Sequence, residues 1–257
     1  MTQNSVLGCG RGVMNNKVAL ITGGARGIGR AVALDLAGPD WSVAICYRTS
    51  AKEAGEVLET VKLKGGKALA LQCDVSDPKA AVGLVHRVEN EWGRIDALIN
   101  GAGPYQRKAL LEETVEGWHA MFNNNLHPVF YLSQAVAPGM KGRNWGRIIC
   151  FSMANADQLI AQPQLTAHYI AKVSLLVLSR TLARILAPYG ITVNAISPGF
   201  IDSGSAPKEE MEAMAKRIPA GYVGSLDDAV SAVRFLLSEE ARYVNGANIH
   251  LSGGWGI

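Results

Sequence analysis

The sequence is poor in cysteine and lacks the patterns by which cysteine and histidine hold metals. Of 257 residues only four are cysteine, at positions 9, 46, 73 and 150, and no two form a Cys-x-x-Cys pair. The five histidines are spread along the chain without zinc-ligand spacing. A disulfide framework and a metal site are therefore not expected. This cysteine usage predicts a reduced, cytoplasmic protein.

Clustered charge and long apolar runs are also missing. The formal net charge is +3 and the basic residues are scattered, so neither nucleic acid nor an anionic membrane is an expected partner. No stretch reaches the roughly 18 apolar residues of a membrane-spanning helix. Residues 1–16 lack the apolar core of a signal peptide, and we interpret them as a flexible leader.

Short apolar, β-rich runs alternate with helical patterns through the rest of the chain. The pattern predicts an α/β fold in one domain over residues 17–257, with a single doubly wound parallel sheet in a Rossmann-like three-layer sandwich. We expect strands over residues 17–22, 42–47, 68–73, 97–100, 146–151, 191–196 and 247–251. We expect helices over residues 27–37, 51–64, 78–92, 114–137, 166–188, 204–218 and 227–237.

A glycine-rich turn follows the first expected strand and opens the first expected helix. It places Gly23, Gly27 and Gly29 within Thr-Gly-Gly-Ala-Arg-Gly-Ile-Gly. Glycines there allow a tight turn and a close approach of a pyrophosphate, and the helix N-terminus offers free N–H groups to it. The turn therefore predicts a dinucleotide site.

The end of the second strand indicates which dinucleotide is bound. NAD sites usually carry a carboxylate there, whereas this chain has Cys-Tyr-Arg-Thr-Ser at residues 46–50. Arg48, with Arg26 in the glycine turn, is suited to a 2′-phosphate. The expected cofactor is NADP(H).

Five ordered segments over residues 17–254 resemble the short-chain dehydrogenase/reductase family, in particular its 3-oxoacyl-ACP reductase-like members. The segments are the glycine turn, Asp-Val at 74–75, Asn-Gly-Ala-Gly at 100–103, Asn-Asn-Asn-Leu at 123–126 and Ser-Pro-Gly-Phe-Ile at 197–201. The resemblance implies the following cofactor-binding residues: Gly23, Arg26, Gly27, Ile28, Gly29, Arg48, Thr49, Asp74, Val75, Asn100, Gly101, Ala102, Lys172, Pro198, Gly199, Ile201 and Ser203. It also implies that Asn125 holds a water in a proton relay.

The catalytic segment departs from the family pattern. The family carries Tyr-x-x-x-Lys, where the lysine binds ribose and lowers the pKa of a phenol that is ordinarily about 10. Residues 166–172 read Thr-Ala-His-Tyr-Ile-Ala-Lys, so His168 lies four residues before Lys172. Tyr169 lies one place later, rotated roughly 100° around the helix. The family's serine position holds Met153, and Ser152 precedes it.

Three hypotheses for the acid/base group remain open. His168 is the proton donor, or a helix irregularity brings Tyr169 into the site, or neither group does proton chemistry. Ser152 positions the substrate if it turns inward, and Asn155 or Asp157 supplies a hydrogen bond if it does not.

The resemblance implies an NADPH-dependent oxidoreductase that reduces a carbonyl or imine bond of a small molecule. The alternative is an NADP(H)-binding protein of this fold without ordinary redox turnover, serving as a sensor or scaffold or catalysing dehydration or cyclisation. Family membership also implies a homo-oligomer, either a tetramer or a dimer.

Overall fold

A seven-stranded parallel sheet forms the centre of the protein in the computed structural model, which describes residues 16–204 and 207–257. The predicted leader lies outside the described residues except for Asn16. The strand order is β3-β2-β1-β4-β5-β6-β9. The strands are β1 (Lys17–Thr22), β2 (Trp41–Tyr47), β3 (Lys67–Gln72), β4 (Ala97–Asn100), β5 (Gly146–Phe151), β6 (Ile191–Pro198) and β9 (Asn248–Leu251).

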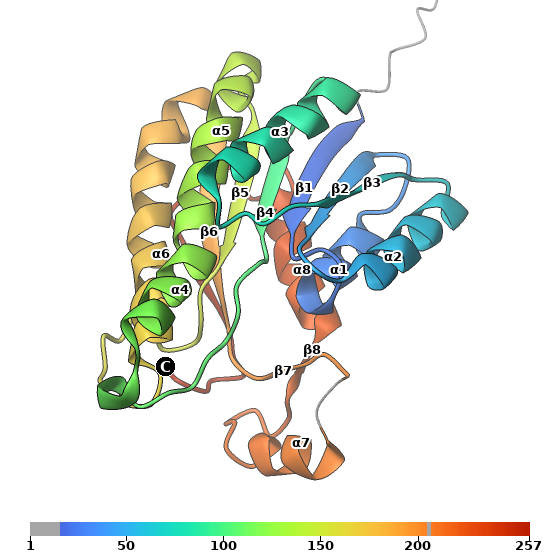
Figure 1. The fold of residues 1–257 in the computed structure, drawn as a ribbon. Helices are drawn as coiled ribbons and strands as arrows, with labels where there is room; N and C mark the ends of the chain where they lie inside the picture. The colour runs from blue at the N-terminus through green and yellow to red at the C-terminus, as the bar shows by residue number, and fades with distance from the viewer. Residues whose placement is uncertain (1–15, 205–206) are drawn as a thin grey trace, which may run out of the picture.

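Helices cover both faces of this sheet (Figure 1). The helices of the described residues are α1 (Gly27–Asp35), α2 (Ala51–Leu63), α3 (Pro78–Trp92), α4 (Val115–Asn125), α5 (His127–Arg143), α6 (Thr166–Leu186), α7 (Lys208–Ala215) and α8 (Leu226–Leu237), of which α7 lies away from the sheet faces. Short 3₁₀ turns lie at Leu110–Glu112 and Ala187–Tyr189.

Two apolar cores, one on each face, follow from the alternation of side chains along the strands. In β1, Leu20 points toward α3, α5 and α6, whereas Ile21 points toward α1, α2 and α8. Both side chains are fully buried. Since both faces are covered, the strands read as continuous apolar runs, as expected for a parallel sheet. The doubly wound α/β prediction is confirmed.

The prediction of one helix over residues 114–137 is wrong in one respect, because the structure has two helices there. α4 ends at Asn125 and α5 begins at His127. Pro128 has no N–H to bond the carbonyl four residues earlier, so the helical hydrogen-bond ladder is interrupted at this point. The break separates α4 from α5, so that α4 ends at Asn125, close to the cavity described below.

The segment after β6 also differs from expectation. The expected helix over residues 204–218 is shorter, because α7 spans only Lys208–Ala215. An unexpected parallel pair, β7 (Ile201–Asp202) with β8 (Gly224–Ser225), joins the two ends of the segment that contains α7. In Figure 1, α7 projects beyond the carboxyl ends of the strands.

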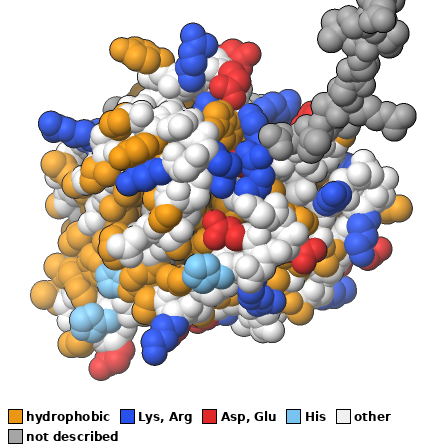
Figure 2. Space-filling view, turned by 90° about the horizontal axis from the view of Figure 1, so that it is seen from above, with side chains coloured by type: hydrophobic (Ala, Val, Ile, Leu, Met, Phe, Trp, Pro, Cys, Tyr) orange, Lys and Arg blue, Asp and Glu red, His pale blue; other side chains and the backbone are white. Residues whose placement is uncertain are grey.

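Charged side chains of both signs are interspersed on the face shown in Figure 2 rather than gathered in one patch. Among the helices of the described residues, none has the length and apolar character needed to cross a membrane. The assignment of residues 17–257 to one domain stays a prediction.

Candidate active site

A cavity of about 980 Å³ lies at the carboxyl ends of the strands. Ligands of open parallel sheets bind at this edge. The expected site residues that line it are Gly23, Arg26, Gly27, Ile28, Gly29, Arg48, Thr49, Asp74, Val75, Gly101, Ala102, Ser152, His168, Lys172, Pro198 and Ser203. Five others lie outside its lining: Asn100, Asn125, Tyr169, Gly199 and Ile201.

The glycine turn brings the start of α1 against the end of β1. A Cβ atom on Gly29 would lie 2.5 Å from the carbonyl oxygen of Gly23, so only glycine fits there. Gly23 itself has φ +65°, a conformation that favours glycine. The N-cap residue Arg26 makes no side-chain cap, and the first turn of α1 holds no acidic residue. Free N–H groups and an uncompensated positive dipole end therefore fit a pyrophosphate.

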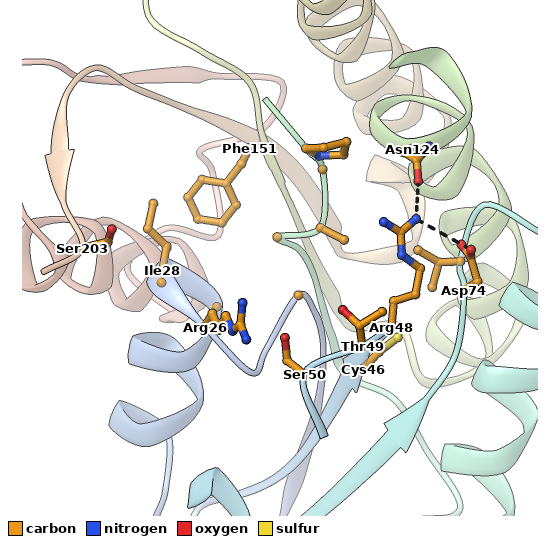
Figure 3. A pocket seen from close by; sticks show the side chains of 18 of the residues that line it. Arg26, Ile28, Cys46, Arg48, Thr49, Ser50, Asp74, Asn124, Phe151 and Ser203 are labelled. Atoms are coloured by element: carbon orange, nitrogen blue, oxygen red, sulfur yellow. Dashed lines mark hydrogen bonds and ion pairs between the residues drawn. The ribbon is translucent and has the colours of Figure 1, made fainter. Parts of the chain in front are cut away.

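Two arginines border the same cavity. Arg48 Nη1 donates a 3.1 Å hydrogen bond to Asn124 Oδ1 and lies 3.7 Å from Asp74 Oδ2 (Figure 3). Arg26 forms an ion pair with Glu53 on α2. Both arginine side chains are more than half exposed, so they can meet a bound anion without first leaving a buried site.

Asp74 is also a turn residue. It accepts hydrogen bonds from the backbone N–H and the hydroxyl of Ser76, at 3.0 and 2.7 Å. The Ser76 hydroxyl, supported by Arg48, holds the pKa of the Asp74 carboxyl below its ordinary value. Asp74 therefore lines the cavity as a charged carboxylate at neutral pH.

His168 and Lys172 both line the cavity. The part of the cavity beside them, where the sequence predicts catalysis, is called the catalytic end below. Both side chains are buried, and the Lys172 ammonium donates a 2.9 Å hydrogen bond to the carbonyl of Phe151. Burial lowers the pKa of Lys172 to about 8. Burial, and then the charge of Lys172, lower the pKa of His168 to about 4. At neutral pH this site therefore holds an ammonium beside a neutral imidazole.

Tyr169 points elsewhere. Its hydroxyl donates a 2.8 Å hydrogen bond to the carbonyl of Asn155 and accepts one of 3.2 Å from the backbone N–H of Ile160. α6 is a regular α-helix through this segment. Tyr169 is therefore rotated about 100° from His168 around the helix axis and does not point in the same direction. The phenol ties down the loop that precedes α6.

Ser152 lines the cavity, but its hydroxyl donates a 2.7 Å hydrogen bond to the backbone carbonyl of Lys172. Met153 packs instead against the small apolar cluster around Leu176. Asn155 and Asp157 do not line the cavity, and Asp157 lies 2.8 Å from His250 Nε2. Ser152 thus lines the cavity with its hydroxyl proton already engaged.

Asn125 stands directly behind the cavity wall. Its amide donates to the carbonyls of Met121 and Pro104, at 3.0 and 3.2 Å. Its Oδ1 is buried without a hydrogen-bond partner among the described residues. A Cβ atom on Gly103 would come within 2.5 Å of that oxygen and 3.5 Å of Lys172 Nζ. An unpaired acceptor beside the lysine fits a bound water.

β6 contributes Pro198 to the lining, and Ser203, which follows it in the chain, lines the same cavity. Gly199 instead donates its N–H to the carbonyl of Leu251 at 2.9 Å. Ile201 lies in the β7–β8 pair and borders a smaller cavity of about 140 Å³. These two residues support the site from behind.

Sequence reasoning missed several residues at the site, among them Ser50, Gly103, Pro104 and Phe151 in the cavity lining. Asn124 lines the cavity and holds Arg48, and Tyr105 meets His168 edge-on with 5.2 Å between ring centroids. Cys46 and Cys73 line the same cavity near Arg48. The only signals in the sequence were the run of three asparagines and the loop after Gly103, and neither indicates a contact across the fold.

The loops over residues 101–113 and 153–165 are joined. The backbone N–H of Leu110 donates a 2.9 Å hydrogen bond to the carbonyl of Pro163. Residues 101–113 carry Tyr105, and residues 153–165 carry the partners of Tyr169. Both loops expose large apolar side chains, with Leu111 98% and Leu159 74% exposed.

The fold and this site define a dinucleotide-binding oxidoreductase of the Rossmann type. A family model described as enoyl-(acyl carrier protein) reductase matches residues 23–256. The 3-oxoacyl-(acyl-carrier-protein) reductase FabG of Staphylococcus aureus is 35% identical over 241 residues, covering 93% of this chain and 97% of the relative. That of Pseudomonas aeruginosa is 36% identical over 249 residues, covering 94% and 98%.

Solved structures agree. A mutant short-chain dehydrogenase/reductase from Serratia marcescens superposes with a TM-score of 0.87 at 31% identity, covering 94% of this chain and 98% of its own. A blue fluorescent protein from a metagenomic library, solved in complex with NADPH, has a TM-score of 0.87 at 32% identity, covering 95% and 99%. The chain belongs to the short-chain dehydrogenase/reductase family, whose members use a nicotinamide cofactor.

Proposed function

We propose that this oxidoreductase uses NADPH to reduce a carbonyl or imine bond of a small molecule, with His168 and Lys172 as its proton-transfer pair. One observation carries the proposal: His168 and Lys172 line the cavity that contains the glycine turn, while the hydroxyl of Tyr169 is bonded to Asn155 outside it. Residues four apart lie on the same face of a helix, so His168 and Lys172 are directed into the same cavity.

The cofactor assignment rests on charge. The glycine turn and the uncapped start of α1 would hold the pyrophosphate, and Arg48 and Arg26 would hold a 2′-phosphate. Thr49, Val75, Pro198 and Ser203, which are also expected contacts, line the same cavity. Bound NADPH would supply the hydride.

The proton is assigned to Lys172, with His168 passing it on. With a pKa of about 8, the Lys172 ammonium is mostly charged at neutral pH and is acidic enough to give up a proton. A neutral imidazole can donate from one ring nitrogen while its other nitrogen is reprotonated. His168 Nδ1 has no hydrogen-bond partner among the described residues, and the ring hydrogen-bonds the backbone carbonyl of Pro104, which the substrate oxygen would replace as acceptor. Asn125 Oδ1 would hold a water that reconnects Lys172 to solvent.

The names of the relatives, which specify a 3-oxoacyl-(acyl-carrier-protein) substrate, support a ketone as the substrate class. A ketone of that kind requires a hydrogen-bond donor for its oxygen. The Ser152 hydroxyl donates to the Lys172 carbonyl, so we assign this role to His168. We also propose a cytoplasmic homo-oligomer, a tetramer or a dimer, in keeping with the family resemblance.

The test measures NADPH oxidation, monitored as the loss of NADPH absorbance. The substrate panel contains 3-oxoacyl thioesters, simple ketones, imines, pterins and enoyl thioesters. His168→Ala, Tyr169→Phe and Lys172→Met are compared with wild type. We expect turnover of a ketone or imine that His168→Ala and Lys172→Met abolish and Tyr169→Phe retains. His168→Tyr, which recreates the family spacing, should keep measurable activity.

The opposite results are informative. Turnover that depends on Tyr169 and not on His168 would overturn the proton assignment. Substrate loss without NADPH oxidation would favour dehydration or cyclisation. NADPH oxidation only with enoyl thioesters would mean that the enzyme reduces a C=C bond and not a carbonyl or imine bond.

A further inference from the structure

The last turn of α4 ends in two asparagines that are oriented in the same way. Asn124 Nδ2 donates to the carbonyl of Ala120 at 2.8 Å, and Asn125 Nδ2 donates to that of Met121 at 3.0 Å. Each bond reaches back four residues along the helix and fixes which end of the amide faces outward. Each side chain therefore presents its Oδ1 to the surroundings of the helix. Because they are neighbours in sequence, the two oxygens point about 100° apart.

The two oxygens face the two ends of the cofactor cavity. Asn125 Oδ1 lies toward Gly103 and Lys172, at the catalytic end. Asn124 Oδ1 accepts the 3.1 Å hydrogen bond from Arg48. Figure 3 shows the Arg48 guanidinium reaching from the loop after β2 to Asn124 on α4, with Asp74 beside it. Three separate elements thus meet at one cation.

Holding Arg48 in this way favours binding of a phosphate. An arginine side chain is long and flexible, and ordering it when the ligand arrives costs binding free energy. Asn124 orders it beforehand, from a helix and not from a mobile loop. An amide oxygen is also uncharged, so it holds the guanidinium without repelling an incoming phosphate. Asp74 is the charged neighbour, but it lies farther away and its carboxylate also accepts from Ser76.

We propose that Asn124 is the positioning residue that holds Arg48 for the 2′-phosphate and thereby sets the preference for NADPH over NADH. The inference rests on the cofactor assignment of the proposed function. It adds that the preference is built jointly by β2 and α4, so that an arginine after β2 without its partner on α4 discriminates less well.

The experiment is a binding titration and needs no substrate. The Kd of NADPH and of NADH is measured by nucleotide fluorescence for wild type, Asn124→Leu, Arg48→Ala and the double variant. Leucine has nearly the size of asparagine, favours helix, and cannot accept a hydrogen bond. We expect the Kd of NADPH to rise roughly three- to tenfold in Asn124→Leu, while that of NADH changes by less than about twofold.

A double-mutant cycle separates positioning from general packing. In the Arg48→Ala background, Asn124→Leu should have no further effect on NADPH, because the group that it positions is gone. The matched control is Asn123→Leu, the same substitution one residue earlier, where the side chain is exposed and outside the cavity lining. It should leave both affinities unchanged. If Asn124→Leu fails to fold, Asn124→Ala takes its place in the same cycle.

Several outcomes would overturn the inference. Equal weakening of NADPH and NADH, an unchanged NADPH affinity, or an Asn124 effect that persists without Arg48 would each do so. A wild type that does not prefer NADPH would overturn the cofactor assignment together with this inference. A wild type that prefers NADPH through Arg48, with no role for Asn124, would overturn the inference alone.

Discussion

The hydroxyl of Tyr169 donates its proton to the backbone carbonyl of Asn155, 2.8 Å away, and so lies outside the cavity that His168 lines. His168 and Tyr169 are neighbours in sequence but have different roles. His168 faces the reacting end of the cavity, and Tyr169 anchors the loop before α6.

This division predicts opposite effects of two substitutions. Tyr169→Phe should lower the free energy of unfolding by about 1–2 kcal/mol, because the buried phenol loses its bonds to Asn155 and Ile160, and should keep most of the activity. His168→Ala should lower kcat by about 100-fold or more with a smaller change in stability. Urea unfolding and steady-state kinetics on both variants check this. An inactive Tyr169→Phe that unfolds like wild type would contradict it.

Lys172 predicts an alkaline limit to reduction. Its pKa of about 8 means that the ammonium loses its proton as pH rises through that value. We therefore expect kcat/KM for reduction to be constant near neutrality and to fall above about pH 8. The measurement is the pH profile with a fixed ketone. A profile that stays flat well above pH 8 would remove Lys172 as the source of the proton.

His168 predicts a loss of stability in acid. Its pKa is 6.5 in the unfolded chain and about 4 in the folded one, chiefly because of burial. Between these values the unfolded chain binds the proton and the folded chain does not, so the free energy of unfolding falls as pH is lowered through this window. His168→Asn should remove part of that slope. Urea unfolding at several pH values measures it, and equal slopes in both proteins would refute the assignment.

Tyr105 tests the cause of that pKa. It packs edge-on against His168 and helps to keep it from water. Tyr105→Ala should raise the pKa of His168 toward its ordinary value of 6.5, whereas Tyr105→Phe, which keeps the ring, should leave it near 4. NMR titration of the imidazole reports both. An unmoved pKa in Tyr105→Ala would assign the burial to other neighbours.

The glycine turn predicts a steric effect on both stability and cofactor binding. A methyl group on Gly29 would press on the carbonyl of Gly23 at 2.5 Å, so Gly29→Ala should cost about 1–3 kcal/mol of stability and weaken NADPH binding. Gly55→Ala is the control, because no heavy atom lies within 4 Å of its added Cβ in α2. It should raise stability by about 0.5–1 kcal/mol and leave NADPH binding alone. Equal effects of the two substitutions would contradict the steric account.

Much of the fold was predictable because its signals are local. The apolar run before Gly23 and the glycines after it place β1, the turn and α1 in order, and such units stack into a parallel sheet in few ways. The break between α4 and α5 was missed because the helical pattern continues across it, although Pro128 marks it. The β7–β8 pair was missed because two-residue strands carry no periodicity.

The catalytic end was harder, because its outcome depends on contacts between distant segments. The spacing to Lys172 put His168 on the right face, but only the partners at Asn155 and Ile160 show where Tyr169 points. The bond from Arg48 to Asn124 joins residues 76 apart in the sequence. Nothing in a run of asparagines distinguishes the one that meets an arginine.

The hydrogen bond from the Leu110 N–H to the Pro163 carbonyl couples the loops over residues 101–113 and 153–165. Because both partners are backbone groups, the bond depends on the conformation of the two loops and not on their side chains. A graft that changes the length of one of these loops in this enzyme should therefore carry the other loop with it.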